Sequence, residues 1–159
     1  MAGHGAPELF VDAAGAKVAI IASSWHTEIM DGLIAGAQGA LVDAQVTDVT
    51  VVRVPGSFEL PLVSQAYARA GHDVVIALGV IIRGGTPHFE YVSAAATDGL
   101  NRVTLDTGVP IGFGLLTCDD DAQALDRAGL PDSREDKGRE AAQAALATWN
   151  VLRTLAAQT

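Results

Sequence analysis

Four short apolar runs, separated by longer segments of helical period, constrain the fold of this chain most strongly. The runs are KVAIIA (17–22), VTVVRV (49–54), VVIALGVII (74–82) and VPIGFGLLT (109–117). In the segment after the third run, Phe89, Val92, Ala96, Leu100 and Val103 recur every three or four residues and give one apolar face. Strands alternating with helices imply parallel β-α-β units whose helices cover both faces of the sheet. The sequence therefore predicts an α/β fold, a three-layer αβα sandwich around a four-stranded parallel sheet.

The length of 159 residues suits one domain with a single core. We expect that domain to span residues 17–159, behind an N-terminal arm at 1–16 that is either flexible or paired with a neighbouring subunit's sheet edge. Hydrophobic residues make up 49% of the chain and the mean hydropathy is +0.27. No apolar run approaches the roughly 18 residues of a membrane span. The surplus apolar surface is more easily buried between subunits, which predicts an oligomer.

Charge and cysteine content narrow the partners and the compartment. The net charge of -9 argues against nucleic acid or an anionic membrane as the partner, although a local group of cations could still bind a small anion. Cys118 is the only cysteine, so the chain has no internal disulfide and we expect a cytoplasmic protein with an inert, buried thiol. The first 16 residues lack the cationic and apolar regions of a secretory signal, so none is expected.

Ligands of open parallel sheets bind at the carboxyl ends of the strands, so the segments that follow the runs are the candidate site. After the third run the chain reads VIIRGGTPHFEYV (80–92), in which Arg83 ends the apolar stretch. Gly84 and Gly85 permit a tight turn with uncovered amides, Thr86 is predicted as an N-cap, and Pro87 as the first helical residue. Free amides at a helix N-terminus attract phosphate, although an ordinary strand-to-helix turn would have the same residues.

Two ring side chains extend this hypothesis. His88 lies in the predicted first turn of the helix, and histidine in general exchanges protons near neutral pH. A single helical histidine is more often structural or solvated, but its place beside the turn favours a site. Trp25 follows the first strand in SSWHTE (23–28), where it is either a core residue or a flat surface for a heterocycle. Its neighbour His26 is assigned to the surface.

The other strand ends give weaker signals. In PGSFELP (55–61), Ser57 is a plausible cap and Glu59 suits the first helical turn, while the hydroxyl and carboxylate together could hold a polyol chain. Phe113 lies between two glycines and is a core residue unless a ligand or a neighbouring chain meets its ring. Arg127 and Lys137 are either solvated cations or the completion of an anion site.

The last helix is predicted to span 133–157 because Ser133-Arg134-Glu135-Asp136 forms a capping-box pattern. The aspartates of CDDD (118–121) are interpreted as caps of the helix that follows them. A signalling receiver would instead need a fuller acidic pocket at the strand ends. A flavodoxin-type electron carrier would need a Gly- and Thr-rich phosphate loop after the first strand, and the sequence has none there.

Taken together, SSWH, PGSFELP, GVIIRGGTPHFEYV, DRAGLP and DKG closely resemble the 6,7-dimethyl-8-ribityllumazine synthase family, in order from about residue 17 to the C-terminus. The resemblance implies a flavodoxin-like sandwich assembled as pentamers, with each active site between adjacent subunits. It also implies condensation of 5-amino-6-(D-ribitylamino)uracil with 3,4-dihydroxy-2-butanone 4-phosphate to give the lumazine, phosphate and water. No metal or organic cofactor is used in the family.

The resemblance also assigns roles to individual residues. Trp25 matches the aromatic residue that stacks on the pyrimidine, His88 the proton-transfer residue, and Phe113 a ring supplied by the neighbouring subunit. The remaining contacts to the uracil and its ribityl chain fall on Ser57, Phe58, Glu59, Val80, Ile81 and Ile82. The phosphate contacts fall on Gly85, Thr86, Arg127 and Lys137.

Two departures from the family pattern bear on these assignments. Gly85 stands where the family often has a residue with a side chain, which keeps the amide but loosens the turn. The loop LPDSRE (130–135) is longer than in the forms that close into capsids, which favours a free pentamer or a modest stack of pentamers. The alternative from within the family is a relative that binds a lumazine or flavin without making it.

Overall fold

The computed structural model describes residues 9–159 and contains the predicted four-stranded parallel sheet. The strands are β1 (Lys17–Ser23), β2 (Asp48–Val54), β3 (Val74–Ile82) and β4 (Ile111–Cys118), in the order β2-β1-β3-β4. β4 begins two residues later than predicted because Val109 still belongs to the turn, where its N–H donates to the Thr107 hydroxyl at 3.2 Å.

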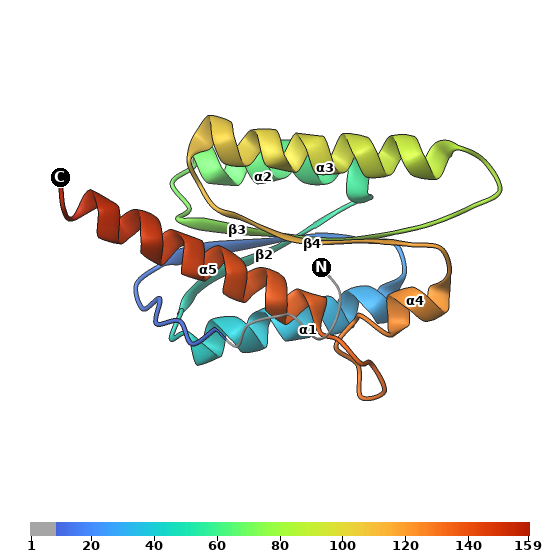
Figure 1. Cartoon of the computed structure of the whole chain (residues 1–159), viewed down its shortest axis with the longest axis horizontal. Helices are drawn as coiled ribbons and strands as arrows, with labels where there is room; N and C mark the ends of the chain where they lie inside the picture. Colours follow the sequence, from blue (N-terminus) through green and yellow to red (C-terminus); the bar gives the residue numbers. More distant parts are fainter. Residues whose placement is uncertain (1–8) are drawn as a thin grey trace.

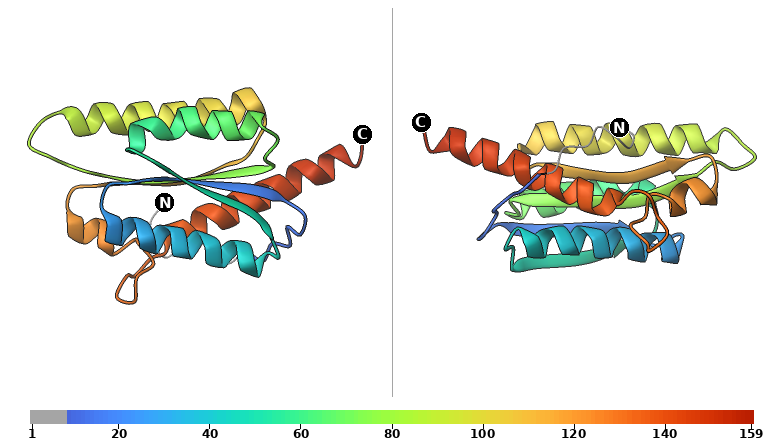
Figure 2. Two further views of the ribbon diagram at one scale, coloured as in Figure 1. Left: turned by 180° about the vertical axis from the view of Figure 1, so that it is seen from behind. Right: turned by 60° about the horizontal axis from the view of Figure 1, so that its bottom comes forward.

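Helices cover both faces of the sheet, so the predicted three-layer sandwich is confirmed. α1 (Thr27–Asp43), α4 (Asp121–Leu125) and α5 (Lys137–Ala156) lie on one face, and α2 (Leu60–Arg69) and α3 (His88–Thr107) on the other (Figure 1). A single 3-10 turn, η2 (Ser57–Glu59), precedes α2. Figure 2 shows α5 crossing its face obliquely and extending past the sheet to the C-terminus.

The core consists of one apolar cluster on each face of the sheet. Strands β1 and β3 are buried along nearly their whole length, whereas the edge strands β2 and β4 are partly exposed, which explains why the central runs are continuously apolar. On α3, Ala96, Leu100 and Val103 are buried as the periodicity predicted. Cys118 is buried as expected, and burial raises the pKa of its thiol.

The start of the last helix differs from the prediction. α5 begins at Lys137, and its N-cap is Asp136, whose carboxylate accepts the Arg139 N–H at 2.9 Å. Ser133 is not a cap because its hydroxyl closes the preceding loop: it accepts the Leu130 N–H at 3.0 Å and donates to the Leu125 carbonyl. The cap expected from CDDD is confirmed at Asp120, whose carboxylate accepts the Gln123 N–H at 2.8 Å.

The described part of the N-terminal segment packs on its own chain. The Ala13 N–H donates to the Ala44 carbonyl at 2.9 Å, and the Asn150 side chain donates to the Asp12 carbonyl at 2.8 Å. The rest of the predicted arm, residues 1–8, lies outside the described residues. Within 9–159, no helix is both long and apolar enough to cross a membrane.

Candidate active site

A cavity of about 860 Å³ opens at the carboxyl ends of the strands. It lies between the loops that follow β1 and β2, the end of β3 and the first two turns of α3. Its volume is in the range of pockets that enclose small-molecule ligands. Most of the predicted site residues line it together: Trp25, Ser57, Phe58, Val80, Ile81, Ile82, Thr86 and His88.

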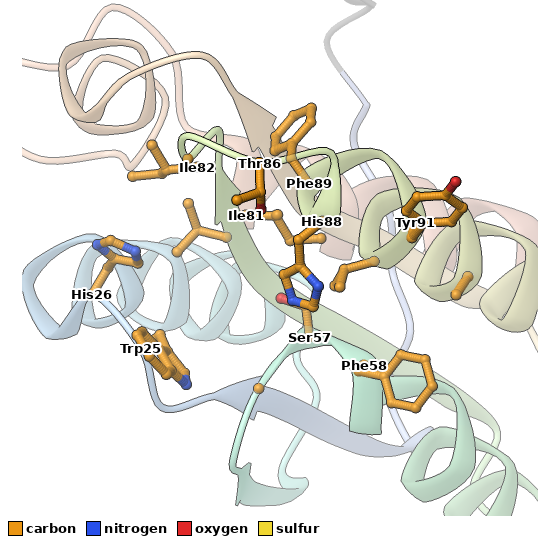
Figure 3. Close-up of a pocket in the computed structure, with 15 residues that line it drawn as sticks. Trp25, His26, Ser57, Phe58, Ile81, Ile82, Thr86, His88, Phe89 and Tyr91 are labelled. Carbon is orange, nitrogen blue, oxygen red and sulfur yellow. The ribbon is translucent and has the colours of Figure 1, made fainter.

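Trp25 forms one wall of the cavity and is not part of the core. Its side chain lies at the end of β1 and is 69% exposed, on the opposite side of the cavity from Phe58 (Figure 3). A large flat side chain left open in a cavity is suited to stacking on a planar ring. This placement excludes the interpretation of Trp25 as a core residue.

His26, which is expected on the surface from the sequence, lines the cavity. Its backbone is in the left-handed region, with φ of 57°, and it is the N-cap of α1. Its Nδ1 lies 3.8 Å from Asp121 Oδ1, so the end of β1 approaches the start of α4. A left-handed histidine is uncommon but tolerated, and no sequence pattern distinguished this one from a surface residue. Only its position directly after Trp25 could have suggested a role.

The floor of the cavity is built by η2, and here the predicted cap is wrong. The N-cap of η2 is Gly56 and that of α2 is Glu59, neither with a side-chain cap bond. The hydroxyl of Ser57 is buried and has no hydrogen-bond partner among the described residues. The Glu59 carboxylate accepts the Gly56 N–H at 2.9 Å, which closes the turn that carries Ser57 and Phe58.

The turn between β3 and α3 is exposed and uncapped. The N-cap of α3 is Pro87, one residue later than predicted, and no side chain caps the helix. Thr86 is therefore not the cap: its side chain lines the cavity, as Figure 3 shows. A Cβ atom added to Gly84 or Gly85 would meet no atom within 4 Å, so this turn is open to a ligand. The start of a helix without a side-chain cap is favourable for an anion.

His88 is the first residue of α3 and projects into the same space. Its ring extends from the helix into the cavity, between Trp25 on one side and Phe58 on the other (Figure 3). Tyr91, one turn further along α3, also lines the cavity and was not predicted, although its i+3 spacing from His88 could have indicated it. The cavity thus combines a flat aromatic wall, an uncapped helix start and an imidazole.

Of the remaining predicted residues, Glu59 and Gly85 belong to turns that border the cavity but are not among its lining residues. Phe113, Arg127 and Lys137 do not line it either. Phe113 is 50% exposed and lines a second cavity of about 450 Å³ together with Lys137. Arg127 lies next to Lys137 in space, because the Lys137 N–H donates to the Arg127 carbonyl at 3.0 Å. The guanidinium of Arg127 donates to the Gln123 carbonyl at 2.8 Å. The two predicted phosphate-binding cations are therefore neighbours, but the described chain does not bring them into the cavity that contains His88.

The ammonium of Lys137 is paired with two carboxylates. Burial lowers the pKa of Lys137, but hydrogen bonds from its ammonium to Glu135 and Glu140 outweigh that effect, so its pKa is raised. The hydrogen bond from Lys137 lowers the pKa of Glu135. At the end of β3, hydrogen bonds to Asp119 and Glu90 raise the pKa of Arg83. No group of residues within 9–159 has the composition of a metal site.

Comparisons with known proteins point to one family. Residues 15–153 match the family model described as 6,7-dimethyl-8-ribityllumazine synthase. The chain is 62% identical over 156 residues to a 6,7-dimethyl-8-ribityllumazine synthase of Kineococcus radiotolerans, covering 98% of this chain and 97% of that protein. It is 63% identical over 157 residues to the protein of the same name from Leifsonia xyli subsp. xyli, covering 98% and 99%. A Nocardioides protein of that name is 61% identical over 156 residues, covering 98% and 97%.

Proposed function

Because the chain belongs to the 6,7-dimethyl-8-ribityllumazine synthase family, we propose that it catalyses the reaction for which that family is named. The substrates are 5-amino-6-(D-ribitylamino)uracil and 3,4-dihydroxy-2-butanone 4-phosphate. The products are the lumazine, inorganic phosphate and two molecules of water. The observation that supports this most directly is the single cavity that unites Trp25, the uncapped turn before α3 and His88.

The chemistry proceeds by condensation, elimination and ring closure. The uracil 5-amine attacks the ketone, and loss of water gives an imine. A proton next to the imine is then removed and inorganic phosphate leaves. Loss of phosphate leaves an enol, which takes up a proton and tautomerises to a new ketone. The 6-ribitylamino nitrogen attacks this ketone, and loss of the second water completes the lumazine ring. Every step moves a proton, so a group that both accepts and donates protons can serve several of them.

In this scheme the residues in and beside the cavity have separate roles. The uracil ring stacks on Trp25, with Ser57, Phe58, Glu59 and the end of β3 holding the ring edge and the ribityl chain. The phosphate ester binds the amides of Gly85 and Thr86, and His88 transfers protons between the two substrates. Holding two reactants face to face can contribute roughly 7–11 kcal/mol in the best cases. Positioning is therefore the larger contribution, and the imidazole the smaller one.

Mixing the two substrates with the purified protein tests the proposal. We expect the lumazine absorbance to appear at a rate proportional to enzyme concentration, together with one equivalent of inorganic phosphate. The rival is a family relative that binds a lumazine or flavin without making it. Tight lumazine binding with no phosphate release above the uncatalysed rate would support that rival.

We further propose that the protein acts as a pentamer with an active site at each subunit interface. Support comes from the separation of the two cavities: Phe113 is half exposed, and neither it nor Lys137 lines the cavity that contains His88. A neighbouring subunit could present Phe113 and the Arg127–Lys137 pair to that cavity. The protruding loop 130–135 favours a free pentamer or a stack of pentamers over a closed shell.

Two measurements examine this assembly. Light scattering should give five times the 16.4 kDa chain mass, or ten times if pentamers pair. Unfolding and refolding His88→Ala together with Arg127→Ala should restore part of the activity that each variant lacks, because mixed interfaces combine two intact halves. A monomeric mass, or no recovery of activity in mixtures that form oligomers, would contradict active sites shared between subunits.

We also propose that the protein lies in the cytoplasm, because its single cysteine is buried and forms no disulfide.

A further inference from the structure

One exposed side chain, that of Arg83, joins three separate segments around the turn before α3. Its Nε donates to Asp119 Oδ1 at 2.8 Å, and its Nη1 donates to Glu90 Oε1 at 3.1 Å. The guanidinium carbon lies 4.3 Å from the centre of the Phe89 ring. Asp119 directly follows β4, whereas Phe89 and Glu90 belong to the first turn of α3. The contacts therefore link the ends of two strands to the start of a helix.

The turn between these contacts has little else to hold it. Gly84 and Gly85 are exposed, and the connection they form reaches out beyond the layers of the fold (Figure 1). Among the described residues, backbone hydrogen bonds fix only its two ends, where the Arg83 N–H donates to the Cys118 carbonyl at 2.9 Å and the Glu90 N–H to the Pro87 carbonyl at 3.0 Å. Two adjacent glycines have wide conformational freedom, so an external restraint has a large effect on such a turn.

The positive charge of Arg83 is already balanced by carboxylates, so it is poorly suited to attract an anionic substrate. One guanidinium faces two carboxylates, so the group formed by Arg83, Asp119 and Glu90 carries a net negative charge. A phosphate arriving at the adjacent turn would gain little attraction from it. Single exposed ion pairs contribute little, but a planar guanidinium that donates in two directions and stacks on a ring is held in one orientation.

We infer that Arg83 is a positioning residue, which holds the turn of Gly84–Thr86 and His88 in register for the phosphate substrate without contacting it. This inference rests on the proposed function, because it assumes that the turn binds phosphate. Its direct rival is that Arg83 leaves its carboxylates and binds the phosphate itself.

Replacing the two carboxylates distinguishes these two roles, because the roles predict opposite changes in the affinity for the phosphate substrate. Asp119→Asn and Glu90→Gln each delete a negative charge near the turn, so electrostatics alone would strengthen phosphate binding. If Arg83 positions the turn, each variant loosens it, and the KM for the butanone phosphate rises several-fold while that for the uracil changes little. We expect Arg83→Gln to raise it about 10-fold or more, since a displacement of about 1 Å can cost 100-fold. Arg83→Lys should recover only part, because an ammonium keeps the charge but neither donates as a planar fork nor stacks flat.

The experiment measures both KM values for these variants and the Kd of inorganic phosphate on the purified oligomer. Arg102→Gln is the matched control, because Arg102 forms an exposed ion pair with Asp106 at 3.2 Å elsewhere on α3. Tighter phosphate binding in Asp119→Asn and Glu90→Gln would overturn the inference in favour of direct contact. Unchanged KM values in all the variants would overturn it altogether.

The inference can still be tested if one variant fails to fold or if the wild-type protein is inactive. If Arg83→Gln fails to fold, the carboxylate variants still decide, because each removes only one contact. If the wild-type protein makes no lumazine, the proposed function fails, whereas the phosphate Kd of the same variants still tests the inference.

Discussion

The hydroxyl oxygen of Ser57 lies 2.7 Å from the place that a Cβ atom on Gly79 would occupy. Gly79 is in the middle of β3, and Ser57 is the first residue of η2, so the floor of the cavity rests directly on the sheet. Contacts below 3.0 Å to a Cβ require something to move. The glycine in the apolar run 74–82 is therefore needed for the close approach of η2, and not for a turn.

Gly79→Ala should lower the free energy of unfolding by about 1–3 kcal/mol, the usual cost of overpacking. It should also raise the KM for the uracil substrate, because η2 is pushed into the cavity. Adding Ser57→Ala removes the closest contact and should recover part of the lost stability. Urea unfolding measures the stability, and steady-state kinetics measure the KM. Equal losses of stability with and without Ser57→Ala would show that Leu60 and Leu115, at 3.0 and 2.9 Å from the same place, dominate.

His88→Ala should lower turnover by about 10- to 1000-fold, because general acid–base groups typically contribute 100- to 10,000-fold and positioning is retained here. Both KM values should change little. His72→Ala is a comparison variant, since His72 is buried away from the cavity lining and hydrogen-bonded to the Tyr67 carbonyl at 3.0 Å. Complete loss of turnover in His88→Ala with normal binding of both substrates would show that positioning alone contributes far less than proposed.

Arg127→Ala should raise the KM for the butanone phosphate about 10-fold or more, because a charge-assisted hydrogen bond contributes about 1.5–3 kcal/mol. The KM for the uracil should rise much less. Arg69→Ala, at the exposed end of α2, is the control for loss of a cation. An unchanged KM for the phosphate substrate would remove Arg127 from its proposed role.

Glu135→Gln tests the pH dependence of stability. Because Lys137 lowers the pKa of Glu135 in the folded chain, the pair stabilises the fold fully above the ordinary carboxyl pKa of 4.5. That contribution is lost as the pH falls through the lower, folded value. We expect Glu135→Gln to cost about 1–3 kcal/mol at pH 7, with the difference from wild type shrinking as the pH falls below the ordinary carboxyl pKa of 4.5. Asp132→Asn, an exposed acid of the same loop, should show no such trend. A difference that grows toward acid pH would contradict the pairing.

The strands were predictable because β1 and β3 are buried on both faces and read as unbroken apolar runs. The aspartate cap of α4 was also predictable, but the caps assigned to hydroxyl side chains were not, because a hydroxyl has several uses. Ser133 closes a loop and Ser57 packs on Gly79, while Asp136 serves as the cap of α5. A cap motif specifies a local hydrogen bond, and tertiary contacts decide whether it forms.

The candidate site was likewise predictable only in part. Trp25, Thr86 and His88 each follow a strand end in sequence, so the rule for parallel sheets was enough to bring them together. The contact between Arg83 and Asp119 joins residues 36 positions apart in the sequence. It forms because β3 and β4 are adjacent in the sheet, and the apolar runs alone do not reveal the strand order. The left-handed backbone of His26 likewise had no signal in the sequence.

The most direct measurement is a crystal structure of the protein with a ribityl-uracil mimic and inorganic phosphate. We predict that the pyrimidine ring lies against Trp25 and that the phosphate binds the amides of Gly85 and Thr86, with His88 between them. A ligand bound at another place, with this cavity unoccupied in the same crystal, would contradict the account.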